Sequence, residues 1–168
     1  MENTTLLLNK EQTIQKIRRI AHQIYEQNFQ EKEIIFAGVY KKGYKFAELL
    51  LIEFSKIAKT KASLVKITLD KRAPLQSTIT LDCEDKVITN KTIILVDDVL
   101  SSGRTLAYSL KPFLNLEIKK LQVAVIVNRN QASFPVHADF EGYSLSTTLQ
   151  EHIFVELFDE TKFGVYLG

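Results

Sequence analysis

Helical spacing of apolar residues is the first regularity along this chain. Asn9 and Gln12 form a capping-box pattern, in which each side chain can bind the other residue's backbone N–H. Apolar residues then recur three or four positions apart, at Ile14, Ile17, Ile20, Ala21 and Ile24. This spacing predicts an amphipathic helix over about residues 10–29. A second helical pattern covers residues 44–59, and a third begins near Arg104.

Continuous apolar runs separate the helical patterns. Three of them suit strands buried on both faces and cover residues 33–39, 92–96 and 121–127. Weaker or β-branched patterns predict further strands at residues 64–69, 77–81, 152–157 and 164–167. Alternation of buried strands with helices predicts an α/β fold, in which helices flank a mostly parallel twisted sheet. Ligands of such sheets bind beyond the carboxyl ends of the strands, so we expect the site in the loops 39–43 and 97–105.

Length and composition indicate one ordinary globular domain. The 168 residues are 45% apolar and 25% charged, which excludes disorder and coiled coil and favours a single domain over residues 1–168. A net charge of +2 is too small for a protein built mainly to hold nucleic acid. The lone Cys83 excludes an internal disulfide, and no signal-peptide start or apolar stretch of roughly 20 residues is present. We therefore expect a cytoplasmic protein that does not enter a membrane.

An acidic pair follows the apolar run 92–96. Asp97 and Asp98 stand where we expect this strand to end, so that both carboxylates can approach a ligand from one side as the chain turns. Because two adjacent anions repel each other, a partner should compensate them, and vicinal hydroxyls or a hydrated Mg²⁺ would do so. The alternative is an ordinary strand followed by an Asp/Ser helix cap.

Small polar residues continue the same segment. Hydroxyl groups, a glycine and a basic residue stand at Ser101, Ser102, Gly103, Arg104 and Thr105. A permissive backbone with exposed N–H groups at a helix start suits a phosphate dianion. A sugar diol beside a phosphate predicts a phosphorylated ribose as the ligand. The acidic pair and this loop together favour a functional site over a helix cap.

The segment resembles the phosphoribosyl pyrophosphate signature of the type I phosphoribosyltransferases. The likeness covers nearly the whole chain and points to the subfamily of pyrimidine operon attenuators that are also uracil phosphoribosyltransferases. It depends on residues 17–22, 65–69, 96–100, 125–129 and 135–140. The resemblance implies a type I phosphoribosyltransferase-like fold with a small hood, a flexible lid hairpin at about residues 70–90, and a homodimer.

The resemblance also implies an activity. The enzyme would use phosphoribosyl pyrophosphate and Mg²⁺, transfer the phosphoribosyl group to a nucleobase and release pyrophosphate. Asp97 and Asp98 would hold the ribose hydroxyls and, indirectly through water and those hydroxyls, the Mg²⁺, while residues 101–105 would bind the 5′-phosphate. Lys71 or Arg72 would arrive on the closing lid as a catalytic cation.

Two further segments match the family by position. Lys41, Lys42 and Gly43 fall where the family places its pyrophosphate loop. Gly43 would allow an unusual backbone turn there, and the alternative for the two lysines is a solvated turn. Asn128 and Arg129 fall where a base would bind.

Uracil is the base that the resemblance favours. Several 6-oxopurine transferases carry an acidic residue where this chain has Ser101, so the serine makes a purine less favourable. Asn128 stands where the subfamily has an acidic residue, so we expect this chain to recognise the base through different contacts from those of the subfamily.

The alternative function is an RNA-binding regulator of pyrimidine genes with little or no catalysis. The subfamily uses basic residues of its first helix for RNA, and Arg19 and His22 match those positions, while Arg18 adds charge. A second RNA-binding loop departs from the pattern, because Gln131–Ala132 replaces a His-Arg pair and His137 replaces an arginine. The simpler interpretation of the basic residues on the first helix is a solvated face.

Overall fold

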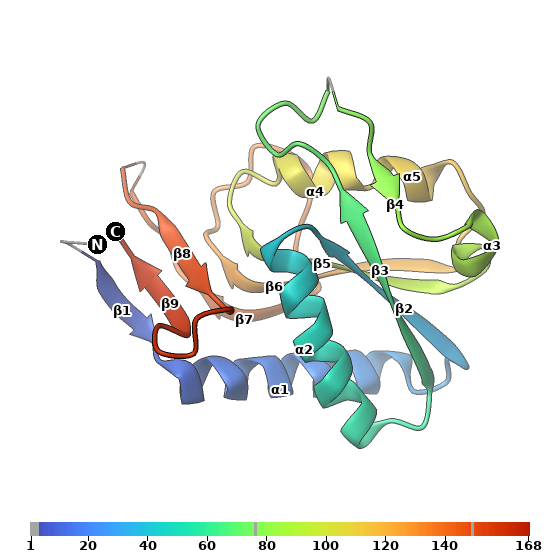
Figure 1. Ribbon diagram of the computed structural model, residues 1–168, viewed down its shortest axis with the longest axis horizontal. Helices are drawn as coiled ribbons and strands as arrows, with labels where there is room; N and C mark the ends of the chain where they lie inside the picture. The colour runs from blue at the N-terminus through green and yellow to red at the C-terminus, as the bar shows by residue number, and fades with distance from the viewer. Residues whose placement is uncertain (1–3, 76, 149) are drawn as a thin grey trace.

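A mostly parallel sheet forms the centre of the molecule (Figure 1). The computed structural model describes residues 4–75, 77–148 and 150–168, and within them the central sheet has six strands in the order β4-β3-β2-β5-β6-β7. These strands are β2 (Glu33–Val39), β3 (Lys61–Thr68), β4 (Thr80–Leu81), β5 (Thr92–Leu100), β6 (Lys120–Asn128) and β7 (Phe140–Ser144). β4 alone runs antiparallel to its neighbour in this sheet. The predicted α/β fold is confirmed.

Helices cover both faces of the central sheet. They are α1 (Lys10–Asn28) and α2 (Lys42–Ile57) on one face and α3 (Asp85–Ile88), α4 (Arg104–Ser109) and α5 (Lys111–Leu114) on the other (Figure 1). Neighbouring residues of a strand point to opposite faces, so Ile94 of β5 packs with α1 and α2, whereas Ile93 packs with α4 and α5. Both isoleucines are fully buried, which confirms that their apolar run is a strand covered on both faces.

The capping box predicted at the start of the first helix is present. The Asn9 side chain accepts a hydrogen bond from the Gln12 N–H at 2.9 Å, and the Gln12 side chain accepts one from the Asn9 N–H at 2.9 Å. Two N–H groups without a helical partner are thereby satisfied. α1 then runs to Asn28, one residue short of the predicted end.

A second, antiparallel sheet forms a hood beside the body of the protein. In the described chain it has three strands in the order β1-β9-β8, namely β1 (Thr5–Leu8), β9 (Gly164–Leu167) and β8 (Ile153–Glu156). The sequence pattern predicted β8 and β9 but missed β1, and it also missed β7 of the central sheet. β7 has no apolar run that periodicity could detect, because polar residues and Gly142 make up most of its length. Val155 and Val165 of the hood are buried in the same cluster as α1, so hood and body share one core.

β3 and β4 form an antiparallel hairpin, with Ile67 opposite Leu81. The connecting loop 69–79 extends beyond the carboxyl end of β3 (Figure 1), and its residue 76 lies outside the described residues. Of the strand predicted at 77–81, only Thr80–Leu81 is a strand. The segment expected as a lid also includes α3, whose Ile88 is fully buried in the core. α3 therefore belongs to the packed body, and closure of the loop stays a prediction.

Membrane insertion was not expected. Within residues 4–75, 77–148 and 150–168 the structure contains no helix with the length and hydropathy of a membrane span.

Candidate functional site

The acidic pair lies inside strand β5. The prediction that this strand ends at residue 96 is wrong, because β6 continues beside it and pairs Leu100 with Asn128. Asp97 is 2% exposed and Asp98 is 8% exposed. Both carboxylates are thus largely withdrawn from water, at the edge of the sheet where ligands of parallel sheets bind.

One lysine bridges the two carboxylates. Lys71 Nζ, from the loop 69–79, lies 3.0 Å from Oδ1 and 3.3 Å from Oδ2 of Asp97. The same nitrogen lies 3.9 Å from Oδ1 of Asp98. Both carboxylates therefore face one ammonium group, although the strand does not turn there, and their contact with a ligand stays a prediction.

The charges of this cluster change its ionisation. Burial and the neighbouring Asp98 carboxylate raise the pKa of Asp97 to about 7, and Lys71 opposes them only in part. Burial by itself would lower the pKa of Lys71, but the attraction of Asp97 and Asp98 outweighs burial, so the pKa of Lys71 is raised. Lys71 is therefore a cation at neutral pH, and Asp97 is the group whose charge changes near neutrality.

The loop predicted to bind phosphate encloses a small cavity next to the acidic pair. The cavity has a volume of about 60 Å³ and is lined by Asp97 together with Ser101, Ser102, Gly103, Arg104 and Thr105. Gly103 has a left-handed backbone, with φ of 80°, directly before α4, a conformation that favours glycine. The carbonyl of Ser102 accepts hydrogen bonds from the N–H groups of Ser133 at 2.8 Å and Phe134 at 3.1 Å. These bonds hold the loop in place.

A larger cleft of about 890 Å³ adjoins Asp98. It is lined by Tyr40, Lys41, Lys42, Lys71, Arg72, Asp98, Glu156 and Phe158. The structure thus gathers the four cations predicted for pyrophosphate binding and catalysis, which come from two separate segments. Four cations against two carboxylates leave the cleft positive, as the binding of a polyanion requires.

The hood contributes two lining residues that the sequence did not reveal, Glu156 and Phe158. The Lys41 ammonium lies 5.5 Å from the centroid of the Phe158 ring. The single sequence signal for these residues is their place at the end of the weak strand pattern 152–157. No local pattern reports a contact between segments so far apart in the chain.

Gly43 lies in the first turn of α2 with helical backbone, so the glycine itself makes no unusual turn, and the unusual backbone of this loop is the cis peptide bond between Tyr40 and Lys41. A Cβ at this position would lie 2.7 Å from the Val96 carbonyl oxygen and 2.8 Å from Asp97 Oδ1. Glycine is needed here because α2 approaches the strand that carries the acidic pair, leaving no room for a side chain.

Asn128 and Arg129 both use their polar groups within the protein. Asn128 Nδ2 donates to Glu141 Oε2 at 2.6 Å, and Asn128 Oδ1 accepts from the Asn130 N–H at 3.0 Å. Arg129 is 7% exposed, and each of its three guanidinium nitrogens donates to a protein acceptor. Arg129 thus lies behind the loop 101–105. Because its guanidinium is already bound to protein acceptors, this geometry disfavours direct contact between Arg129 and a base.

The carboxylate pair is the feature that fits a metal ion. Within the described ranges, no three or more His, Cys, Asp or Glu residues gather into a cage that would hold a metal by themselves. Mg²⁺ does not need such a cage, because it keeps several waters and uses one or two carboxylates together with substrate phosphates. Lys71 already places a cationic group against Asp97 and Asp98.

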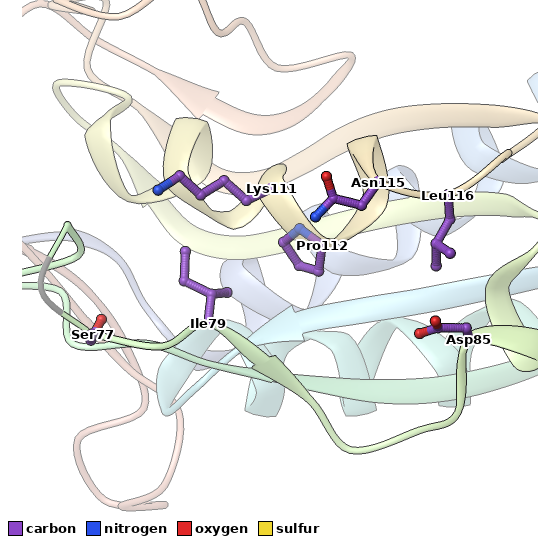
Figure 2. A pocket seen from close by; sticks show the side chains of 7 residues that line it. All are labelled: Ser77, Ile79, Asp85, Lys111, Pro112, Asn115 and Leu116. Carbon is purple, nitrogen blue, oxygen red and sulfur yellow. The ribbon is translucent and has the colours of Figure 1, made fainter.

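Another cavity, of about 470 Å³, lies between the β3–β4 hairpin and α5 (Figure 2). Ile79 on the hairpin side faces Lys111 and Pro112 of α5 across it (Figure 2). The other lining residues are Ser77, Asp85, Asn115 and Leu116. None of the predicted site residues lines this cavity, so it is separate from the acidic pair.

Comparisons with known proteins identify the family of the chain. A family model, the phosphoribosyl transferase domain, matches residues 3–157. Relatives named bifunctional protein PyrR include that of Haemophilus ducreyi, which is 29% identical, with 88% of this chain and 87% of the relative covered. The PyrR of Clostridium novyi is 32% identical, with 92% of this chain and 91% of the relative covered.

Solved structures share the fold at lower identity. A hypoxanthine-guanine phosphoribosyltransferase from Bacillus anthracis has a TM-score of 0.76 at 21% identity, covering 96% of this chain and 95% of that chain. A hypoxanthine phosphoribosyltransferase from Staphylococcus aureus has a TM-score of 0.78 at 17% identity, covering 98% and 90%. The relatives and the family model agree over most of the sequence, and the chain therefore belongs to the phosphoribosyltransferase family.

Proposed function

We propose that this protein is a Mg²⁺-dependent nucleobase phosphoribosyltransferase that converts phosphoribosyl pyrophosphate and uracil to a nucleotide and pyrophosphate. The observation that carries the proposal is the buried pair Asp97–Asp98, set between the small cavity of loop 101–105 and the cationic cleft. Vicinal hydroxyls of ribose would donate hydrogen bonds to the two carboxylates. The sugar would then have its 5′-phosphate on one side of the pair and its pyrophosphate on the other.

Each part of the site has a task in this reaction. The loop 101–105 anchors the 5′-phosphate through hydroxyl and backbone N–H groups, which fixes C1′ relative to the cleft. Lys41, Lys42, Lys71 and Arg72 line the cleft that receives the pyrophosphate. Asp97 and Asp98 would hold Mg²⁺ through water and the ribose hydroxyls, and the ion would supply positive charge beside the pyrophosphate when bound.

Transfer exchanges one bond at C1′ for another. The base nitrogen attacks C1′ from the face opposite the pyrophosphate, the bond from C1′ to the pyrophosphate oxygen breaks, and its electron pair leaves with that oxygen. The proton of the base nitrogen passes to the departing pyrophosphate, so the products are the nucleotide and protonated pyrophosphate. The cations of the cleft stabilise the charge that develops on the departing oxygen, an electrostatic contribution made without rearrangement.

Uracil is proposed from the family resemblance and from the names of the relatives. The resemblance places an acidic residue of several purine transferases where this chain has the hydroxyl of Ser101. Relatives at 29–32% identity are named PyrR, whereas the hypoxanthine-guanine enzymes are similar at 21% identity and support the fold alone.

The test is a panel of bases. Wild-type protein with phosphoribosyl pyrophosphate and Mg²⁺ is incubated with uracil, hypoxanthine, guanine, adenine and orotate, and the nucleotides are separated by chromatography. We expect uridine monophosphate and pyrophosphate in equal amounts. Formation of a purine nucleotide alone would reject uracil, and no nucleotide from any base would reject the enzyme.

A matched pair of variants checks the acidic site. Asp98→Asn removes a charge-assisted hydrogen bond of about 1.5–3 kcal/mol, so affinity for phosphoribosyl pyrophosphate should fall roughly 10- to 150-fold in calorimetry. Glu117→Gln, at an exposed position outside the site, removes the same charge and should leave the affinity unchanged. Equal affinities of the two variants would reject the role of Asp98.

A second candidate function is RNA binding, which the exposed basic residues on α1 favour. Arg18, Arg19 and His22 are all exposed, and Arg18 makes an ion pair with Glu53 at 3.2 Å. A filter-binding titration against the leader of a pyrimidine operon, repeated at several salt concentrations, measures this function. Equal affinity for the leader and for random RNA would reject it. The expected homodimer stays a prediction, which sedimentation equilibrium tests.

A further inference from the structure

Arg129 is a buried guanidinium that joins three loops. Its Nε and Nη2 donate to Thr147 Oγ1 at 2.9 and 2.7 Å, and Nη2 also donates to the Glu151 carbonyl at 2.8 Å. Its Nη1 donates to Ser101 Oγ at 2.9 Å. The Arg129 backbone N–H donates to the Leu100 carbonyl at 2.9 Å. Main chain and side chain of one residue thus both hold the start of the loop 101–105.

Arg129 has no carboxylate within ion-pair distance in the part of the chain that the structure describes. The Glu151 carboxylate attracts Arg129 from beyond that distance and accepts a hydrogen bond from the Thr148 N–H. The acceptors of Arg129 are hydroxyls, carbonyls and an amide, which satisfy the N–H groups but do not cancel a full charge. A buried cation is costly without an anion, so an anion bound nearby would be favoured.

Ser101 stands between this cation and the small cavity. Its oxygen accepts from Arg129 Nη1, and Ser101 also lines the 60 Å³ cavity of loop 101–105. A serine hydroxyl has a single proton to donate. Among the described residues Ser101 Oγ donates to none, so its proton is available to a group in the cavity.

We propose that Arg129 is a positioning residue that acts on the substrate through Ser101. The guanidinium fixes Ser101 Oγ, polarises its O–H bond and directs the proton to an oxygen of the sugar 5′-phosphate. Arg129 itself does not touch the base, which replaces the direct contact expected from the sequence. This inference rests on the proposed function, because it needs a phosphorylated sugar in the cavity.

A double-mutant cycle tests the coupling, with ribose 5-phosphate as the probe and calorimetry as the readout. Ser101→Ala removes the donor and should weaken binding about 10-fold, since the acceptor is charged. Arg129→Gln should weaken binding to a similar extent. The double variant should bind about as weakly as either single variant, because both changes remove one interaction. Losses that multiply to about 100-fold would overturn the proposal, since a purely structural Arg129 would act equally with and without the Ser101 hydroxyl.

Further variants keep the test decisive. Thr147→Val removes the hydroxyl that accepts two bonds from the guanidinium, and serves if Arg129→Gln fails to fold. It should cause a smaller loss of affinity that vanishes in the Ser101→Ala protein, and a loss that persists there would count against the coupling. Lys119→Gln removes a positive charge that is paired with Glu31, outside the site, and should change nothing. Wild-type protein that does not bind ribose 5-phosphate would reject the proposed function itself, whereas binding without coupling would reject this inference alone.

Discussion

Two aspartates with repelling charges lie side by side and buried near the carboxyl end of β5. Their ionisation governs which ligands the site can bind. Burial and Asp98 raise the pKa of Asp97 to about 7, far above its ordinary 3.8. Protons and cationic partners therefore compete for this carboxylate near neutral pH. A sugar diol or a hydrated metal ion would bind best when Asp97 has lost its proton.

The raised pKa of Asp97 predicts that stability falls as pH rises. Between the unfolded pKa of 3.8 and the folded pKa of about 7, the folded protein binds more protons than the unfolded protein does. The contribution of protonated Asp97 is therefore complete below about pH 4 and is lost as pH passes through 7. We expect Asp97→Asn to flatten the fall in the urea midpoint measured from pH 5 to pH 8. Glu117→Gln should keep the wild-type slope, and an Asp97→Asn protein with that slope would contradict the assignment.

The close packing around Gly43 predicts that a side chain at this position would displace the Asp97 carboxylate. In Gly43→Ala the new Cβ would meet Val96 and Asp97 at 2.7–2.8 Å, so α2 must shift or Asp97 must move. Overpacking of this kind typically costs about 1–3 kcal/mol of unfolding free energy, and affinity for ribose 5-phosphate should fall as well. Urea titration and calorimetry measure the two effects. Ser55→Ala, on the exposed side of the same helix, is the control, and an unchanged affinity in Gly43→Ala would show that the close approach is unimportant.

The β3–β4 hairpin matters because its loop carries Lys71 to a different strand. The two strands of the hairpin lie at the edge of the sheet, while β5 lies inside it. The contacts of Lys71 Nζ with both carboxylate oxygens of Asp97, at 3.0 and 3.3 Å, thus tie the loop to the acidic pair. Opening of the loop would expose two carboxylates without their cation, so binding of substrate and position of the loop should depend on each other.

Loss of Lys71 should therefore destabilise the protein in a pH-dependent way. In Lys71→Gln the pKa of Asp97 should rise further, because the attraction that lowers it is gone. The loss of stability should be larger at pH 8 than at pH 5, where Asp97 is already protonated. It should stay below the roughly 3–5 kcal/mol of a fully buried pair, since the Lys71 side chain is 38% exposed. Thermal unfolding at both pH values measures this, with the exposed Lys86→Gln as control, and equal losses at both pH values would contradict it.

The molecule as a whole is held together by a core that hood and body share. Leu157, directly after the hood strand β8, is 2% exposed and belongs to the cluster that contains Phe36 and Ile94 of the body. Two parts that bury side chains in one cluster should unfold together. The single domain expected over residues 1–168 stays a prediction, which this shared core supports.

Truncation of that shared core tests cooperativity. Leu157→Ala should lower the unfolding free energy by about 2–5 kcal/mol and keep one transition. The measurement is urea unfolding by circular dichroism, together with hydrogen exchange of peptides from hood and body. The 71% exposed Leu114→Ala should have little effect. Hood peptides that open well before the body would show that the hood is a separate unit.

Local patterns predicted much of the body and the hood strands β8 and β9, but they missed β1 and β7. The runs around Phe36 and Ile94 form strands because a continuous apolar stretch is most stable when both of its faces are buried, as they are between two layers of helices. β7 escaped detection because an edge strand with few apolar residues has no distinctive period. β1 escaped it because a strand of four residues is too short to show one. Glu156 and Phe158 reached the cleft through pairing of β8 with β9, which no local signal reports.

The candidate site divides in the same way. The acidic pair, the hydroxyl-rich loop and the lysines at 41 and 42 stand out in the sequence, because charges and glycines cluster there beside buried strands. By contrast, the burial of Arg129 behind Ser101 and the contact of Lys71 with Asp97 join residues from separate loops. Chemistry carried by neighbouring residues can be inferred from their order along the chain. The pairing of distant charges was decided by tertiary structure, because only packing sets which groups lose water together and hence which must neutralise one another.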